Sequence, residues 1–218
     1  MSAPAPSGNG ERGAVEAVLG RRVGVFSDVH GATRTLGFAL ETCRAEGVET
    51  IVLLGDLFDR PEQADGCAAV LAGWSVVGVY GNHERDIALA AAEGAHDLLA
   101  ATIALLSRLQ EEVHVDDVRL THDLPSWGMS DPLARMLARR AGVDVTDVED
   151  AMPRITFTGH THFRQARDQH GLLDIARGTL RLDPARRYLL NPGALMIGQY
   201  GIWDRDEGVI TFRNVEQT

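Results

Sequence analysis

The sequence predicts an α/β fold, and three observations support this prediction. Short runs rich in Val and Ile alternate with longer Ala- and Leu-rich segments of helical period, a pattern typical of βαβ units. After residue 175 the rhythm changes to strand-like runs without helices. The chain has 218 residues, 44% hydrophobic and 24% charged, so its length and composition fit one domain with a substantial core.

The elements follow from these patterns in chain order. Strands are predicted at 23–27, 50–55 and 74–81, with helices at about 33–46, 62–72 and 85–108 between and after them. A tight hairpin around Asp116 and Asp117 is predicted at 113–122, followed by a strand at 154–159. The C-terminal part predicts strands at 178–183, 187–191, 200–206 and 208–214, and a Glu-Gly turn pairs the last two as a hairpin.

The N-terminal residues and the cysteines indicate the domain organisation and the cellular compartment of the protein. A flexible tail rich in Ala, Pro, Ser and Gly is predicted at 1–20, and a single domain at 21–218. The tail has neither the charged start nor the apolar core of a secretory signal, and no apolar run approaches a membrane span. The only two cysteines, Cys43 and Cys67, form no CxxC pair, so we expect a reducing cytoplasm.

The charge balance limits the partners. The formal net charge is -10, so a broad basic surface for nucleic-acid phosphates is not expected, and neither is stable nucleic-acid binding. Any anionic substrate must therefore be held by a local feature of the protein.

Asp, Asn and His residues follow five consecutive predicted strands. The strand ends read SDVHG (27–31), GDLFD (55–59), GNHE (81–84), THD (121–123) and GHTH (159–162), and they contain five of the eight histidines. Any one of these segments alone is more simply a turn or a helix cap. Because sites in α/β sheets form beyond the carboxyl ends of strands, the five together predict a metal site.

The ligand types indicate the metals. Imidazole and carboxylate without thiolate suit Mn, Fe, Zn, Ni or Co. The set is too large for one tetrahedral ion, but it is enough for two ions that share a carboxylate: Asp28, His30, Asp56, Asn82, His122, His160 and His162. Two such ions about 3.5–4 Å apart clamp the oxygens of a displacement at phosphorus and lower the pKa of a bridging water. Their positive charge lets an acidic protein bind a phosphate ester.

These segments resemble the calcineurin-like metallophosphoesterase superfamily, whose pattern is D-x-H, G-D-x-x-D, G-N-H-[DE], H and G-H-x-H. The resemblance spans residues 23–162, and NPG at 191–193 is similar to a segment that closes the site in small bacterial and archaeal phosphodiesterases. It implies a four-layer α/β/β/α sandwich of two mixed sheets with flanking helices. The segment 123–153 fits two roles equally well, a packed helix and loop or a cap over the substrate pocket.

The resemblance also implies roles for individual residues. One metal is implied to be held by Asp28, His30, Asp56 and His162, and the other by Asp56, Asn82, His122 and His160, with Asp56 as the bridge. His83 and Asn82 are expected to contact the substrate phosphate, and His83 to donate a proton to the leaving oxygen. Asp59 is expected to accept a hydrogen bond from His83. Arg60 follows the second Asp, as in serine/threonine protein phosphatases, and is either a phosphate ligand or a solvated loop residue.

The function predicted from the sequence is a dinuclear metal-dependent phosphoesterase. It is expected to hydrolyse a phosphomonoester or phosphodiester by direct attack of a metal-bridging hydroxide, and Mn is the ion expected to support activity in vitro. Alternatives within the enzyme class are a serine/threonine protein phosphatase and a nucleotide phosphohydrolase. An alternative of another class is a catalytically silent protein-binding scaffold. The sequence leaves the substrate, a small molecule, a nucleotide or a phosphoprotein, and the oligomeric state open.

Overall fold

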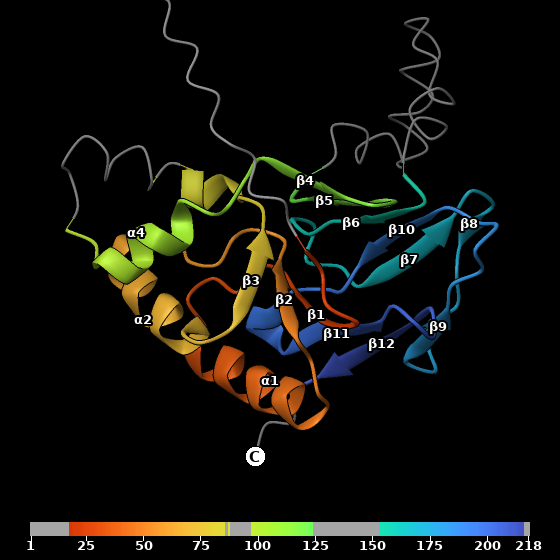
Figure 1. Cartoon of the computed structure of the whole chain (residues 1–218), viewed down its shortest axis with the longest axis horizontal. Helices are drawn as coiled ribbons and strands as arrows, with labels where there is room; N and C mark the ends of the chain where they lie inside the picture. Colours follow the sequence, from red (N-terminus) through yellow and green to blue (C-terminus); the bar gives the residue numbers. More distant parts are fainter. Residues whose placement is uncertain (1–17, 86, 88–96, 124–152, 216–218) are drawn as a thin grey trace, which may run out of the picture.

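Two six-stranded sheets pack face to face in the computed structural model, which describes residues 18–85, 87, 97–123 and 153–215 (Figure 1). The first sheet has the order β3-β2-β1-β11-β12-β9 and the second β4-β5-β6-β10-β7-β8. The strands of the first sheet are β1 (Arg22–Phe26), β2 (Thr50–Leu53), β3 (Ser75–Gly78), β9 (Thr179–Arg181), β11 (Gln199–Asp204) and β12 (Val209–Asn214). Those of the second sheet are β4 (Glu112–Val115), β5 (Val118–Thr121), β6 (Ile155–Phe157), β7 (Gln165–Asp168), β8 (Gly171–Leu172) and β10 (Tyr188–Asn191).

Both sheets are mixed, and their parallel parts set the position of the loops. In the first sheet β1, β2 and β3 run parallel, while β11 pairs with β1 in the antiparallel sense. In the second sheet β5, β6 and β10 run parallel, and β4, β7 and β8 complete it through antiparallel pairs. Parallel strands end at the same edge of a sheet, so the loops after β1, β2 and β3 are neighbours, as are those after β5, β6 and β10.

The alternation of side chains along the strands separates two hydrophobic cores. Val52 and Leu54 belong to the core between the sheets, whereas Ile51 and Leu53 belong to the core under the helices, as period-2 alternation requires. Helices α1 (Thr33–Ala45), α2 (Pro61–Leu71) and α4 (Ala100–Leu106) cover the outer face of the first sheet (Figure 1). A short 3-10 helix, η2 (Leu195–Ile197), precedes β11.

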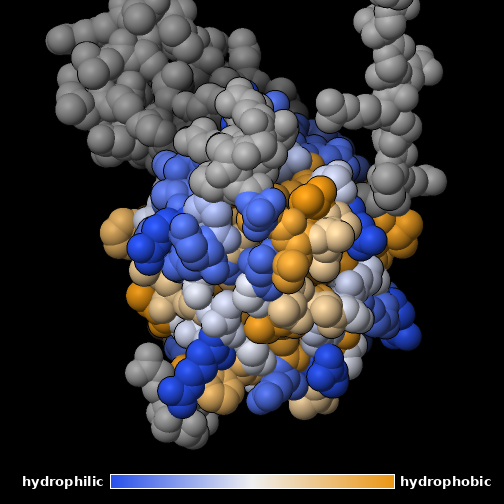
Figure 2. All heavy atoms as spheres, turned by 90° about the vertical axis from the view of Figure 1, so that its left-hand side faces the viewer, coloured by the Kyte–Doolittle hydropathy of each residue, from blue (hydrophilic) through white to orange (hydrophobic). Residues whose placement is uncertain are grey.

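The side of the molecule that carries α2 and α4 shows hydrophilic and hydrophobic side chains interspersed (Figure 2). Leu99 and Ile103, at the start of α4 and within it, are 62% and 53% exposed. Among the described residues, no helix is long and apolar enough to cross a membrane.

The predicted fold class, two mixed sheets with flanking helices, is confirmed. The helices at 33–46 and 62–72, the hairpin at 113–122 and the C-terminal hairpin are all present, with Asp116 in the turn at a φ of 53°. Strands β7 and β8 were not predicted. Most of the 123–153 segment, expected to be either a packed helix and loop or a cap, lies outside the described residues.

One continuous helix over 85–108 is wrong, because residues 97–99 are not helical. Leu99 has an extended backbone (φ -63°, ψ 148°), and its N–H donates to Asp65 Oδ1 at 3.0 Å. The Asp65 carboxylate, which comes from α2, also accepts a hydrogen bond from the Thr102 hydroxyl. A side chain from another helix thus fixes the start of α4, which periodicity within one segment does not predict.

Most of the predicted N-terminal tail, residues 1–17, lies outside the described residues. Of its last three residues, Leu19 is 5% exposed, and the Gly20 N–H donates to Thr50 Oγ1 at 3.1 Å. Leu19 and Gly20, within the predicted tail, therefore belong to the packed part of the chain.

Candidate metal centre

The predicted metal ligands lie on loops with an unusual backbone. Among the described non-glycine residues, six have a positive φ, and all but the hairpin residue Asp116 are predicted ligands, with φ between 48° and 64°: Asp28, His30, Asp56, His160 and His162. Non-glycine residues adopt this conformation infrequently, and it persists only where surrounding contacts hold it. These loops are therefore shaped by contacts outside themselves.

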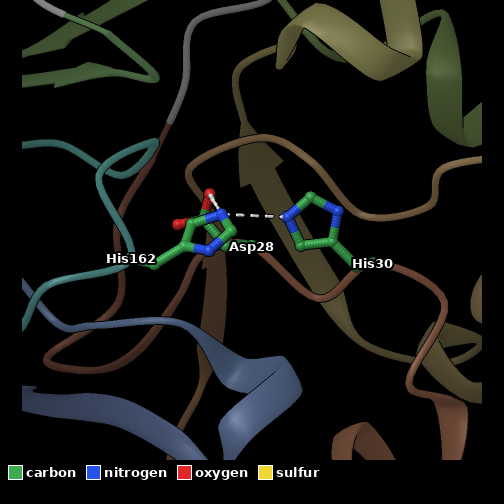
Figure 3. Close-up of side chains that lie close together, drawn as sticks. All are labelled: Asp28, His30 and His162. Carbon is green, nitrogen blue, oxygen red and sulfur yellow. Dashed lines mark hydrogen bonds and ion pairs between the residues drawn. The ribbon is translucent and has the colours of Figure 1, made fainter.

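The first cluster consists of Asp28, His30 and His162 (Figure 3). His162 Nε2 lies 3.3 Å from Asp28 Oδ1 and 3.1 Å from His30 Nε2. Asp28 is fully buried, and its Oδ2 has no hydrogen-bond partner among the described residues. Burial raises the pKa of Asp28 above its ordinary value, because the charged form loses its hydration. The cluster joins the loop after β1 in the first sheet to the loop after β6 in the second.

The second cluster consists of Asp56, His122 and His160. His122 Nε2 lies 3.3 Å from Asp56 Oδ2 and 3.2 Å from His160 Nδ1. His122 Nδ1 donates to the Leu54 carbonyl at 2.6 Å, so the lone pair of Nε2 faces the cluster. Burial acts to raise the pKa of Asp56, but the contacts with His122 and His83 together outweigh it and lower that pKa. Burial likewise acts to lower the pKa of His122, and the contact with Asp56 raises it.

Asp56 lies between the two clusters. Its Oδ2 is 3.3 Å from His122 Nε2 in the second cluster and 4.0 Å from His30 Nε2 in the first. Its Oδ1 accepts the backbone N–H of His83 at 3.3 Å. One carboxylate oxygen of Asp56 therefore faces ligand atoms of both clusters.

The donor set fits divalent metal ions. Imidazole nitrogens and carboxylate oxygens converge in each cluster, within 4.8 Å of one another, and a cation between them would replace the repulsion of facing lone pairs by coordination. The buried, unpartnered Oδ2 of Asp28 is likewise an acceptor that a cation would satisfy. His30 and His122 also have the outer partners typical of metal-binding histidines, since their Nδ1 atoms contact Asp59 Oδ1 and Leu54 O.

Asp59 lies between two histidines. Its Oδ1 is hydrogen-bonded to His30 Nδ1, whereas His83 Nδ1 is 3.7 Å away, beyond hydrogen-bond distance. This differs from the sequence expectation, in which His83 was the partner of Asp59. The direct partner of Asp59 is thus His30, which is itself a predicted metal ligand.

Two other predicted residues stand apart from the clusters. Asn82 is exposed, and within the described part of the chain no hydrogen bond joins its side chain to them. Arg60 is also exposed, and its backbone begins α2, where Gln63 Oε1 accepts the Arg60 N–H at 3.0 Å and Pro61 follows as the first helical residue.

Glu84 is a residue that sequence reasoning left without a role. It is fully buried, and its carboxylate accepts four backbone N–H groups, from Asp56 at 2.8 Å, Phe58 at 3.2 Å, Gly81 at 2.7 Å and also Leu57. Burial raises the pKa of Glu84. The side chain thus ties the loop after β2 to the loop after β3. Its only signal in the sequence was a charged residue at the end of GNHE.

Gly81 permits the close approach of these two loops. A Cβ atom at this position would lie 1.9 Å from Asp56 Oδ1, a distance that no side chain allows. The glycine of GNHE therefore leaves the space that the Asp56 carboxylate occupies.

Two mixed sheets with paired Asp and His clusters at their loops define a metal-dependent hydrolase. The chain belongs to the calcineurin-like phosphoesterase superfamily, whose domain matches residues 22–204, and it is a metal-dependent phosphoesterase. A metallophosphoesterase from Sphaerobacter thermophilus has the same fold, with a TM-score of 0.63 and 22% identity over 90% of this chain and 89% of that chain. An archaeal phosphodiesterase aligns with a TM-score of 0.54 and 16% identity, over 88% of this chain and 99% of that chain. Serine/threonine-protein phosphatase 1 of Salmonella typhimurium is 36% identical over 72 residues, 33% of each chain.

Proposed function

We propose that the protein is a dinuclear phosphoesterase that hydrolyses a phosphomonoester or phosphodiester. The observation that carries this proposal is the position of Asp56 Oδ2 between two Asp/His clusters. One ion would be held by Asp28, His30, Asp56 and His162, and the other by Asp56, Asn82, His122 and His160. When bound, two divalent ions activate water and neutralise the charge of the phosphate.

His83 is the proposed proton donor to the leaving oxygen. Its side chain is 37% exposed, so a substrate can reach it, and its backbone N–H is fixed on Asp56 Oδ1. Nδ1 faces the Asp59 carboxylate at 3.7 Å, which leaves Nε2 to face the substrate. Asp59 would thus orient both a metal ligand and the proton donor. Asn82 and Arg60, both exposed, are proposed to contact the phosphate.

A protein phosphatase is the second candidate. It is supported by the 36% identity with a serine/threonine-protein phosphatase over 72 residues and by the GDLFDR segment, in which Arg60 follows Asp59. A phosphopeptide assay beside small aryl phosphates separates the two, because a protein phosphatase would turn over the peptide with the higher kcat/KM.

We also infer a reducing compartment, since both cysteines are free and buried.

The test is hydrolysis of p-nitrophenyl phosphate and its bis ester by the Mn-loaded protein. Asp56→Ala should abolish turnover, and His83→Ala should lower kcat by about 10²- to 10⁴-fold, as for the loss of a general acid. His114, an exposed histidine of β4 that contacts Glu112 and belongs to neither cluster, gives the matched control, and His114→Ala should retain wild-type activity. Undiminished activity of Asp56→Ala would rule out the dinuclear mechanism.

A further inference from the structure

A buried asparagine, Asn191, lies at the carboxyl end of β10. β10 runs parallel to β6, with Leu190 opposite Phe157, so Asn191 adjoins the loop that carries His160 and His162. The residue is fully buried. A buried amide must use its donors and acceptor within the protein, so its partners indicate what it holds in place.

The amide binds the histidine loop at two points. Asn191 Nδ2 donates to Gly159 O at 2.8 Å and to Thr161 Oγ1 at 3.1 Å, and Oδ1 accepts the Gly193 N–H at 2.8 Å. Only one orientation of the amide satisfies these partners, because the Gly159 carbonyl can only accept and the Gly193 N–H can only donate. The two anchored residues immediately precede His160 and His162.

The chain that follows Asn191 binds the other half of the first cluster. The Leu195 N–H donates to Ser27 O at 2.8 Å, and the Met196 N–H donates to Asp28 O at 3.1 Å. Arg164, just beyond the histidine loop, donates from Nε to Pro192 O at 3.0 Å. Residues 191–196 therefore connect the loop after β6 in the second sheet to the loop after β1 in the first.

We infer that Asn191 is a positioning residue that fixes His160 and His162 relative to Asp28, and thereby sets the affinity of the protein for its metal ions. This inference rests on the proposed dinuclear function. His160 and His162 both have left-handed backbones, with φ of 64° and 59°, which need outside contacts to persist. The Asn191 amide supplies such contacts at Gly159 and Thr161, the residues that precede the two histidines, and the 195–196 backbone fixes Asp28 against the same segment.

The experiment measures metal binding directly. Protein stripped with EDTA is titrated with Mn²⁺ by calorimetry, and the Mn-loaded form is examined by electron paramagnetic resonance for the spectrum of a coupled ion pair. Asn191→Leu keeps the size but removes the donors, and it should weaken Mn²⁺ binding by about tenfold or more and remove the coupled spectrum. Thr161→Val removes one partner of the amide without a change in size, and it should weaken binding in the same direction.

Asp168→Asn is the matched control. Asp168 is a 5% exposed residue of the same sheet, and it accepts hydrogen bonds from the His170 N–H and Arg186 at 2.8 Å each. This variant should lower the melting temperature of the metal-free protein but bind Mn²⁺ within twofold of wild type. Wild-type Mn²⁺ affinity in Asn191→Leu would overturn the inference, and if that variant does not fold, wild-type affinity in Thr161→Val would overturn it. A wild-type protein that binds no divalent ion would instead overturn the proposed function.

Discussion

Replacement of Glu84 by Gln probes the contact that joins the loops after β2 and β3. Oε1 of Glu84 accepts the N–H groups of Leu57 and Phe58, and Oε2 accepts those of Asp56 and Gly81. In Glu84→Gln an NH₂ group replaces one of the two oxygens. Two backbone N–H groups then face a donor, in a position that water does not reach because the residue is fully buried.

The magnitude follows from these two lost acceptors. A buried polar group left without a partner costs about 1–3 kcal/mol, so two cost about 2–6 kcal/mol. Part of this is offset, because burial raises the pKa of Glu84 and the neutral amide avoids the desolvation of a carboxylate. We therefore expect Glu84→Gln to lower the free energy of unfolding by about 2–4 kcal/mol, a large part of the stability of an ordinary domain.

Urea unfolding of the metal-free protein, followed by circular dichroism, measures this difference. Glu112→Gln is the control, because Glu112 is a partly exposed residue of β4 whose partners are Arg119 and His114. Loss of such a pair should cost about 1 kcal/mol or less. An unfolding midpoint of Glu84→Gln that equals that of wild type would refute the reasoning.

Three further predictions concern the metals and acid. Chelation with EDTA should lower the melting temperature, since ions that bind only the folded state stabilise it by about 2.7 kcal/mol at a hundredfold excess over Kd; an unchanged melting curve on Mn²⁺ addition would contradict this. His162→Ala should lose the ion held with Asp28, and His160→Ala the ion held with His122, so elemental analysis should find one ion in each variant where wild type has two. Burial acts to raise the pKa of Asp168, but hydrogen bonds from the His170 N–H and Arg186 outweigh it and lower that pKa. The carboxyl group of Asp168 thus binds its proton more tightly in the unfolded state than in the folded state. The stability that the ionised Asp168 contributes is therefore present above about pH 4 and is lost as the pH falls further. The difference between the urea unfolding midpoints at pH 6 and pH 3 measures this loss of stability, and Asp168→Asn should reduce that difference.

The fold could be predicted where the residues of a segment determine its secondary structure by themselves. Hydrophobic runs of β-branched residues correctly gave β1 and β2, because both are buried on both faces, and they also gave the edge strand β3, which is only partly buried. β7 and β8 were missed, because QARD and GL carry few apolar residues, and they form by pairing with β10 and with each other. The break before α4 was missed for a similar reason, since the carboxylate that stabilises it belongs to α2.

The candidate ligands were predictable because coordination restricts the residue types. Only a few side chains bind divalent ions, so Asp and His at successive strand ends are informative even before the fold is known. The structure brings six of the seven predicted ligands into two clusters. The partner of Asp59 was not predictable, because His30 and His83 both lie near its carboxylate and the order of the residues in the sequence does not show which is nearer.

The residues that hold the ligands in place cannot be predicted in the same way. Asp28, Asp56 and the histidines of GHTH have left-handed backbones, where glycine would cost less, so the need for a ligand side chain outweighs local preference. That strain must be balanced by contacts from elsewhere, and the structure supplies them through Glu84 and Asn191. Apart from the bond of Asn191 to the Thr161 hydroxyl, both act on backbone N–H or C=O groups, which every residue except proline offers in full, so the residue types in the ligand loops reveal little of them. The metal ligands can therefore be predicted from the sequence, whereas the contacts that hold these ligands in place are seen only in the folded structure.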